Sequence, residues 1–239
     1  LICKHLKVCT INNIEIFMEH LTLIIPAKNE KESLPSVLSE LKKYNLKIIV
    51  VLEKEDLDTI NSIKEYDCEI LYQVNKGYGD ALLQGFQNVK TNFFCIFNAD
   101  GSFNPSELKN MYDHAIKGNV DFIFGSRYMS DALSEDDTIV TLIGNKIFTF
   151  IGKIFFSLPI SDILYTFVLG NIQKANALQL KEKGFSFCVE LPILAKKSQH
   201  KLISVPSHER VRIAGKKKVN EFKDGFLILI NMIKIYFKY

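Results

Sequence analysis

The sequence has little excess charge and few cysteines, and each shortage argues against a class of protein. Among 239 residues, 30 basic and 27 acidic side chains leave a formal net charge of +3. That excess is too small to indicate a nucleic-acid partner and leaves room only for local basic patches. The cysteines are widely scattered and suggest neither a zinc cluster nor a disulfide framework; they are Cys3, Cys9, Cys68, Cys95 and Cys188. We therefore expect a cytoplasmic protein.

Secretory and membrane-spanning patterns are also missing. No segment near the first residue combines a basic start, an apolar middle and a small-residue cleavage site, so we expect no export. The most apolar stretch, residues 139–160, is interrupted by Lys146, Lys153, Gly144 and Gly152, whereas a spanning helix needs about twenty apolar residues with few charges. The hydrophobic content of 47% is nevertheless enough for the core of one large α/β domain.

Strand and helix patterns alternate between residues 21 and 124. Short apolar runs predict strands, and the segments between them have helical patterns. The expected strands are 21–26, 47–52, 68–74, 92–97 and 120–124, and the expected helices are 29–41, 56–66, 80–89 and 105–117. This alternation predicts an α/β fold with a parallel, doubly wound sheet flanked by helices. Ligands of such sheets bind beyond the carboxyl ends of the strands.

Polar or glycine-rich residues follow each expected strand, so we expect them to meet in one cleft. These segments are 27–30, 53–54, 76–80, 98–102 and 125–128. The central segment is Asn98-Ala99-Asp100, because a carboxylate beside a strand end can hold a divalent cation that neutralises a nucleotide diphosphate. An Asx turn is the alternative interpretation of these three residues.

Five short motifs occur in a fixed order along the chain. They are Ile24-Ile25-Pro26-Ala27-Lys28-Asn29-Glu30, Gly77-Tyr78-Gly79-Asp80-Ala81, Asn98-Ala99-Asp100-Gly101-Ser102, Gly125-Ser126-Arg127-Tyr128 and Arg212-Ile213-Ala214-Gly215-Lys216-Lys217-Lys218. With them the chain resembles glycosyltransferase family 2 from about residue 21 to residue 236. Within that family it is most similar to dolichyl-phosphate mannose synthases and polyprenyl-phosphate glycosyltransferases, which have the GT-A fold.

The resemblance implies an inverting hexosyltransferase that uses a divalent metal, Mg²⁺ or Mn²⁺. The donor would be a nucleotide-diphosphate sugar of the GDP-mannose or UDP-glucose type, and the acceptor a polyprenyl or dolichyl phosphate. Asp100 and Ser102 would hold the metal, Arg127 would meet the acceptor phosphate, and Arg212 and Lys218 would lie over the reacting phosphates. Donor contacts are implied at Pro26, Ala27, Asn29, Glu30, Glu53, Lys76, Gly79, Asn98 and Ala99.

Three residues depart from the family pattern. Asn98 stands where an aspartate is usual, so one carboxylate of the metal pair is replaced by a weaker amide ligand. Glu53 also replaces an aspartate, and Ser102 replaces a glutamine. Donor identity therefore stays open, and Glu53 can also be interpreted as a solvated charge at a strand end. Asp162 matches a family position on the acceptor side, with a helix N-cap as the alternative.

The chemistry of the acceptor decides whether a general base is needed. A phosphate monoester, with a second pKa of about 6, is mostly ionised at neutral pH and needs little help. Arg127 and Arg212 have the planar fork that matches phosphate oxygens, and the lysines at 216–218 add point charge. A saccharide hydroxyl, as in surface polysaccharide synthesis, would need a base, for which Glu190 is the candidate. We also expect Glu190, in an apolar stretch, to orient the cationic loop. An impaired module that only binds nucleotide sugar is the third possibility.

Two segments, 139–160 and 222–239, predict amphipathic helices with lysines on one face. Such helices can lie among lipid headgroups, which predicts a peripheral protein on the cytoplasmic face of a membrane. Packing of both helices on the core is the alternative. The expected organisation is an N-terminal extension over 1–20, a transferase domain over 21–221 and a C-terminal helix over 222–239; the oligomeric state is left open.

Overall fold

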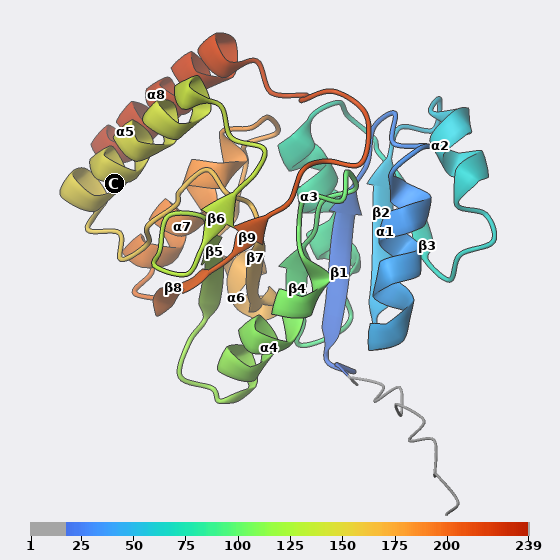
Figure 1. Cartoon of the computed structure of the whole chain (residues 1–239). Coiled ribbons are helices and arrows are strands. Elements are labelled where there is room, and N and C mark those ends of the chain that lie inside the picture. Colours follow the sequence, from blue (N-terminus) through green and yellow to red (C-terminus); the bar gives the residue numbers. More distant parts are fainter. Residues whose placement is uncertain (1–17, 239) are drawn as a thin grey trace, which may run out of the picture.

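A seven-stranded sheet forms the centre of the protein, whose computed structural model describes residues 18–238 (Figure 1). The strand order is β3-β2-β1-β4-β7-β5-β8. These strands are β1 (Leu21–Pro26), β2 (Lys47–Leu52), β3 (Glu69–Tyr72), β4 (Phe93–Ile96), β5 (Phe122–Ser126), β7 (Val168–Asn171) and β8 (Leu202–Pro206). The α/β class with a mostly parallel sheet is confirmed. The expected N-terminal extension, with Cys3 and Cys9, lies outside the described residues except for 18–20.

β1 and β2 have the bounds that the sequence predicted. β1 and β2 are parallel neighbours, with Ile24 opposite Ile49 and Ile25 opposite Val50. Helices cover both faces of the sheet, so a central strand must be apolar along its whole length. Residues 21–25 of β1 are buried accordingly. A continuous apolar run was therefore a reliable signal for these two strands.

β7 runs antiparallel between β4 and β5, which the sequence analysis did not predict. The strand has only four residues, and its last residue, Asn171, is already the N-cap of the next helix. A run of this length is too short to show a period. Gly170 is required at its centre, because a Cβ there would lie 2.5 Å from the Phe122 ring.

Two layers of helices enclose the sheet, and each layer has its own hydrophobic core. Val37 of α1 and Met111 of α4 lie in the core on one face, whereas Phe86 of α3 and Phe187 of α7 lie in the core on the other. The helices of these layers are α1 (Leu34–Leu41), α2 (Leu57–Ser62), α3 (Tyr78–Asn88), α4 (Leu108–Ile116), α6 (Ile172–Ala177) and α7 (Phe187–Lys197), with short 3-10 turns at Lys42–Tyr44 and Pro105–Glu107.

The two long helices α5 (Ile139–Phe156) and α8 (Glu221–Lys238) lie side by side at one end of the molecule (Figure 1). They run in the same direction, since Thr138 contacts Glu221 at one end and Phe155 packs on Tyr236 at the other. α5 ends four residues earlier than expected because Ser157 adopts a left-handed conformation with φ of 53°.

α5 also has the length and hydropathy of a membrane-crossing helix, the one such helix among residues 18–238. In the fold it packs against α7 and α8 and buries Asn145, Thr149, Gly152 and Phe156. Its contacts therefore place it along the surface of the domain.

A second, two-stranded sheet joins β6 (Leu133–Ser134) to β9 (His208–Glu209). The chain between β9 and α8 then crosses the carboxyl ends of β4 and β1 before turning back to α8 (Figure 1). We call residues 210–220 the strap.

Candidate active site

A pocket of about 1020 Å³ opens at the carboxyl ends of the strands. Its polar part contains most of the residues that the sequence brought forward: Pro26, Ala27, Glu30, Glu53, Asn98, Ala99, Asp100, Arg127, Arg212 and Lys218. The expected cleft is therefore present. Asn29, Lys76, Gly79 and Ser102 were also expected there, but they do not line it.

Asp100 lies in a tight turn after β4, and its two carboxylate oxygens have different neighbours. Oδ1 accepts hydrogen bonds from the Ser102 amide at 3.0 Å and from the Ser102 hydroxyl at 2.7 Å. Asn98 donates in turn to the Ser102 hydroxyl at 3.2 Å. Ser102 is buried behind Asp100, so it orients the carboxylate. The other oxygen, Oδ2, lies 3.3 Å from Nη1 of Arg212.

The strap carries three cations that are paired with acidic residues of the pocket. Arg212 joins Asp100 to Asp136, whose Oδ2 lies 2.8 Å from Nη2. Lys217 donates to the backbone carbonyl of Asp136 at 2.6 Å, and Lys218 lies 3.3 Å from Glu30. Burial alone would lower the pKa of Arg212, but Asp136 and Asp100 raise it overall. Arg212 is therefore charged, and the ion pairs position all three side chains over the pocket.

The expected donor-side residues split into two groups. Glu30 and Glu53 line the pocket, where Glu53 pairs with Lys28 at 2.8 Å. Glu30 is buried and accepts from the Ser33 hydroxyl at 2.6 Å. Asn29 instead has a positive φ of 52°, and its backbone N–H donates to the Asp56 carboxylate at 2.7 Å. It therefore shapes the loop without reaching the pocket.

Gly77 and Gly79 form a close contact with the segment 182–184. A Cβ at either position would lie 2.2 Å from a carbonyl oxygen of that segment. Glu190 holds the segment in place, because its carboxylate accepts hydrogen bonds from the Lys181 and Glu182 amides at 2.9 to 3.0 Å. The expectation that Glu190 orients the cationic strap is therefore wrong. Burial raises the pKa of Glu190, but this carboxylate does not line the pocket.

Arg127 is surrounded by three carboxylates. Its guanidinium donates to Asp162 through Nε at 2.8 Å and Nη2 at 3.1 Å, while Nη1 donates to Asp137 at 3.2 Å and to Glu209 at 3.1 Å. Burial would lower the pKa of Arg127, but Asp162 and Glu209 raise it well above its ordinary value. The expected contact between Arg127 and an acceptor phosphate stays a prediction. It would require these ion pairs to rearrange.

Asp162 is fully buried and takes part in this cluster as an acceptor for Arg127 and for Asn145 of α5. It also accepts from the Arg127 backbone amide at 3.1 Å. The interpretation of Asp162 as a helix N-cap finds no support, since the segment 157–167 around it is not helical. By accepting hydrogen bonds from Arg127 and Asn145, Asp162 instead connects the Arg127 loop to α5.

Several pocket residues escaped the sequence analysis. Asp136 and Asp137 lie in the loop before α5, in no recognisable motif, yet they bind Arg212 and Arg127. Glu209 was missed for the same reason. Local sequence carried no signal for these residues beyond a short acidic run at 135–137, because their partners are distant in the chain.

Comparison with known proteins identifies the family of the chain. The model of the family described as "Glycosyl transferase family 2" matches residues 22–177. The chain belongs to glycosyltransferase family 2. The match covers β1 to α6 and includes the Asp100 turn and Arg127, whereas the strap and α8 lie beyond it.

Three curated relatives of this family 2 protein are each about one-quarter identical to it. An uncharacterised protein of Methanocaldococcus jannaschii is 26% identical over 92% of this chain and 93% of its own length. A dolichol-phosphate mannosyltransferase of Pyrococcus furiosus is 26% identical over 83% of this chain and 58% of its own. A UDP-N-acetylglucosamine–dolichyl-phosphate N-acetylglucosaminyltransferase of Methanococcus voltae is 24% identical over 77% of this chain and 83% of its own.

Solved structures support the GT-A fold of the family 2 domain. Glucosyl-3-phosphoglycerate synthase of Mycobacterium tuberculosis, in complex with Mn²⁺, UDP and glucosyl-3-phosphoglycerate, aligns with a TM-score of 0.72 at 12% identity, covering 91% of this chain and 80% of that one. Mannosyl-3-phosphoglycerate synthase of Rubrobacter xylanophilus aligns with a TM-score of 0.72 at 14% identity, and the alignment covers 92% of this chain and 74% of the synthase.

The residues of this transferase suit a metal that brings phosphate ligands with it. The described part of the chain has no group of three or more His, Cys, Asp or Glu side chains able to hold an ion alone. Mg²⁺ and similar ions, however, are commonly bound through one or two carboxylates together with substrate phosphates. Asp100 offers one carboxylate oxygen to the pocket side, and the buried Ser102 fixes the other. This donor set fits a nucleotide-bound cation.

Proposed function

We propose that the protein transfers a hexose from a nucleotide-diphosphate sugar to a lipid phosphate. One observation carries this proposal: the pocket that contains Asp100 continues without interruption into an apolar groove between α5 and α8. A charged reaction centre joined to an apolar channel fits an acceptor with a phosphate head and a hydrocarbon tail. The lipid-phosphate acceptors named for two relatives support the same class.

The polar end of the pocket suits a nucleotide diphosphate. Arg212, Lys217 and Lys218 are paired with carboxylates, and the phosphates of the donor would take over these cations. A divalent metal at Asp100 would supply charge that stabilises the departing diphosphate. Glu30 and Glu53 remain the proposed contacts for the nucleoside.

The apolar end of the pocket suits a hydrocarbon chain. It is lined by Ile143 and Ile147 of α5 and by Phe222, Phe226 and Leu229 of α8. These side chains are between 36% and 82% exposed, so a lipid tail would bury much of their surface. Burial of apolar surface contributes about 25 cal/mol per Å², and the tail would therefore add to acceptor affinity.

The same helices would hold the protein on a membrane surface. Phe150 and Ile154 of α5 are 64% and 60% exposed, on a helix that also exposes Lys146 and Lys153. Exposed apolar side chains beside lysines fit the interface between acyl chains and anionic headgroups. We propose a peripheral location in which α5 and α8 lie along the bilayer, next to the acceptor.

The proposal is tested by incubating the protein with radiolabelled nucleotide sugar, Mn²⁺ and a polyprenyl phosphate. We expect label in the organic phase, and we expect Asp100→Ala to abolish its transfer. Ile147→Asp, in the groove, should raise the KM for a long-chain acceptor at least about tenfold and leave donor binding unchanged. Asp113→Ala on α4, outside the pocket, is the control and should behave like wild type.

Label that appears only in water-soluble products would refute the lipid acceptor. Equal KM values for long-chain and short-chain acceptors in the wild type would refute the groove as the site of the tail.

Transfer to a saccharide hydroxyl is the second candidate, and one observation favours it. Asp137 and Glu209 line the pocket, so carboxylates are available to accept a proton, although Glu190 is not. Burial raises the pKa of Glu209, offset in part by Arg127, and a raised pKa suits a general base. A saccharide screen would then find an acceptor whose turnover falls at least about 100-fold in Glu209→Gln. Unchanged turnover would refute Glu209 as that base.

A further inference from the structure

We propose that Arg210 is the positioning residue that fixes the turn carrying Asp100. The inference rests on the proposed role of Asp100 in metal binding, and it concerns a residue outside the five family motifs. Arg210 is the first residue of the strap and does not line the pocket. Any effect of Arg210 on a bound cation must therefore pass through the Asp100 turn.

The four carbonyl groups of the turn all accept hydrogen bonds from residues 210–213. The carbonyl of Asp100 accepts from the Ile213 amide at 2.8 Å, and that of Ser102 accepts from the Arg210 amide at 2.8 Å. The carbonyls of Gly101 and Phe103 accept from Nε and Nη2 of Arg210 at 3.1 Å and 2.8 Å. Arg210 thus contributes three of these four bonds.

The guanidinium of Arg210 also ties the turn to α1. Nη1 and Nη2 lie 3.3 Å and 3.0 Å from the two carboxylate oxygens of Glu40. Binding two carbonyls and a carboxylate at once requires the planar array of N–H groups that arginine has and lysine lacks. α1 follows the Pro26–Glu30 loop in the chain, so Arg210 links both sides of the proposed donor site to one helix.

Close packing in the turn makes its backbone dependent on the strap. Gly101 has a φ of 84°, and a Cβ at this position would lie 2.5 Å from the Ile213 side chain. The side chain of Asp100 in turn contacts Ser102, whose carbonyl is held by Arg210. Loss of the Arg210 side chain would therefore let the Asp100 carboxylate move, while the backbone hydrogen bonds to the Ser102 and Asp100 carbonyls remain.

The inference is tested first without metal or donor. Hydrogen exchange at the Ser102 and Ile213 amides reports on the turn, since both amides are hydrogen-bonded within it. We expect both amides to exchange at least about tenfold faster in Arg210→Ala, because the two side-chain hydrogen bonds to the Gly101 and Phe103 carbonyls are lost. Arg210→Lys should lie in between. Glu40→Gln, which keeps both carbonyl contacts, should change the exchange rates less than about twofold.

The second measurement is Mn²⁺ binding in the presence of UDP, followed by electron paramagnetic resonance of the free ion. A residue that orients a ligand typically changes metal affinity about 10- to 100-fold, so we expect the dissociation constant of Arg210→Ala to rise about tenfold. Arg210→Ala with wild-type exchange rates and wild-type Mn²⁺ affinity would overturn the inference. So would a melting temperature that falls while both readouts stay unchanged.

The two proposals fail in different ways. Asp100→Asn that binds Mn²⁺ as tightly as wild type would refute the metal assignment. The exchange rates of the metal-free Arg210 variants would still decide whether Arg210 fixes the turn.

Discussion

Arg127 brings one positive charge into contact with three carboxylates, one of which is Glu209. Its Oε2 accepts from Arg127 and from Ser134. Burial nevertheless raises its pKa above the ordinary value of 4.5. A carboxylate with a raised pKa binds its proton more tightly in the folded chain than in the unfolded chain.

This difference predicts a pH dependence of stability. The extra proton affinity stabilises the folded protein fully below pH 4.5, and the stabilisation is lost as the pH rises through the raised pKa of Glu209. Because glutamine does not ionise, Glu209→Gln should become steadily more stable relative to wild type above pH 4.5, by at most about 1.4 kcal/mol per pH unit. Urea denaturation from pH 4.5 to 7 measures this difference.

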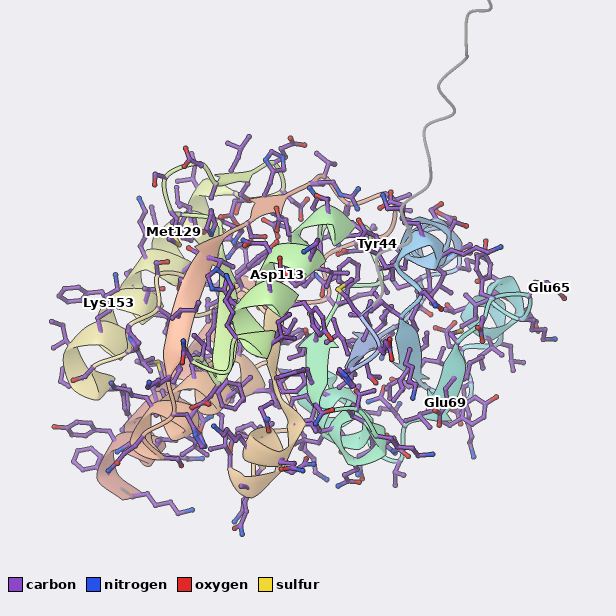
Figure 2. All side chains as sticks on the ribbon, turned by 90° about the horizontal axis from the view of Figure 1, so that it is seen from below. Tyr44, Glu65, Glu69, Asp113, Met129 and Lys153 are labelled. Carbon is purple, nitrogen blue, oxygen red and sulfur yellow. The ribbon has the colours of Figure 1, made fainter. Side chains whose placement is uncertain are left out.

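Glu65→Gln, at an exposed position on the far side of the molecule, is the control for the loss of a carboxylate (Figure 2). If Glu209→Gln behaves like that control, the raised pKa is not realised in solution.

Among individual residues, the sequence identified those that belong to a motif and missed the side chains that contact them. Asp100 and Arg212 were both expected near the reacting phosphates, and Oδ2 of Asp100 lies 3.3 Å from Nη1 of Arg212. Asp136 was missed although it contacts the same guanidinium. A short acidic run has many interpretations, and only the fold shows which cation it meets.

Among the elements, α8 contains a polar residue in an apolar contact. Asn231 is 6% exposed, on the face of α8 that also buries Ile228, Met232 and Ile235. Its Nδ2 is the one buried side-chain nitrogen or oxygen without a hydrogen-bond partner within residues 18–238. A buried polar group left without a partner costs about 1–3 kcal/mol.

Replacing this residue by a similar-sized apolar side chain should therefore stabilise the protein. We expect Asn231→Leu to raise the free energy of unfolding by about 1–2 kcal/mol, measured by urea denaturation. Asn110→Leu, on the exposed face of α4, is the matched control and should change it by less than about 0.5 kcal/mol. A loss of stability in Asn231→Leu would show that the amide has a partner, such as a water molecule.

Elements with a strong hydrophobic pattern of their own were predicted well. Short strands that form only by pairing with another strand were not. β1 and β2 have the expected bounds because buried parallel strands are continuously apolar. β7 and the two-residue strands β6 and β9 escaped prediction because pairing with a partner, not their own pattern, makes them strands. The expected helix 29–41 begins only at Leu34, since Ser33 is its N-cap and Asn29 has a left-handed φ of 52° in the loop before it.

For the whole molecule, the position of α5 and α8 predicts how the protein meets a membrane. Both helices lie at one end of the sheet, and Lys153 of α5 lies on the opposite side of the molecule from Glu65 and Glu69 (Figure 2). The double variant Phe150→Glu/Ile154→Glu should weaken sedimentation with anionic vesicles at least about tenfold, because apolar surface and charge attraction both contribute to such binding.

Leu57→Glu is the control, since Leu57 is 62% exposed on α2, away from this end. Equal vesicle binding by wild type and the double variant would refute the proposed orientation. The cytoplasmic side of that membrane, and the division into 1–20, 21–221 and 222–239, stay predictions from the sequence.

The sequence by itself determined the α/β class, the central strands and the family, because these follow from hydrophobic periodicity and from short motifs whose residues are adjacent in the chain. Only the tertiary structure decided that Arg212 faces Asp100, that three carboxylates surround Arg127, and that Glu190 supports a different loop from the one expected. These are contacts between distant segments, and their geometry depends on how the strap and the α5 loop pack over the sheet.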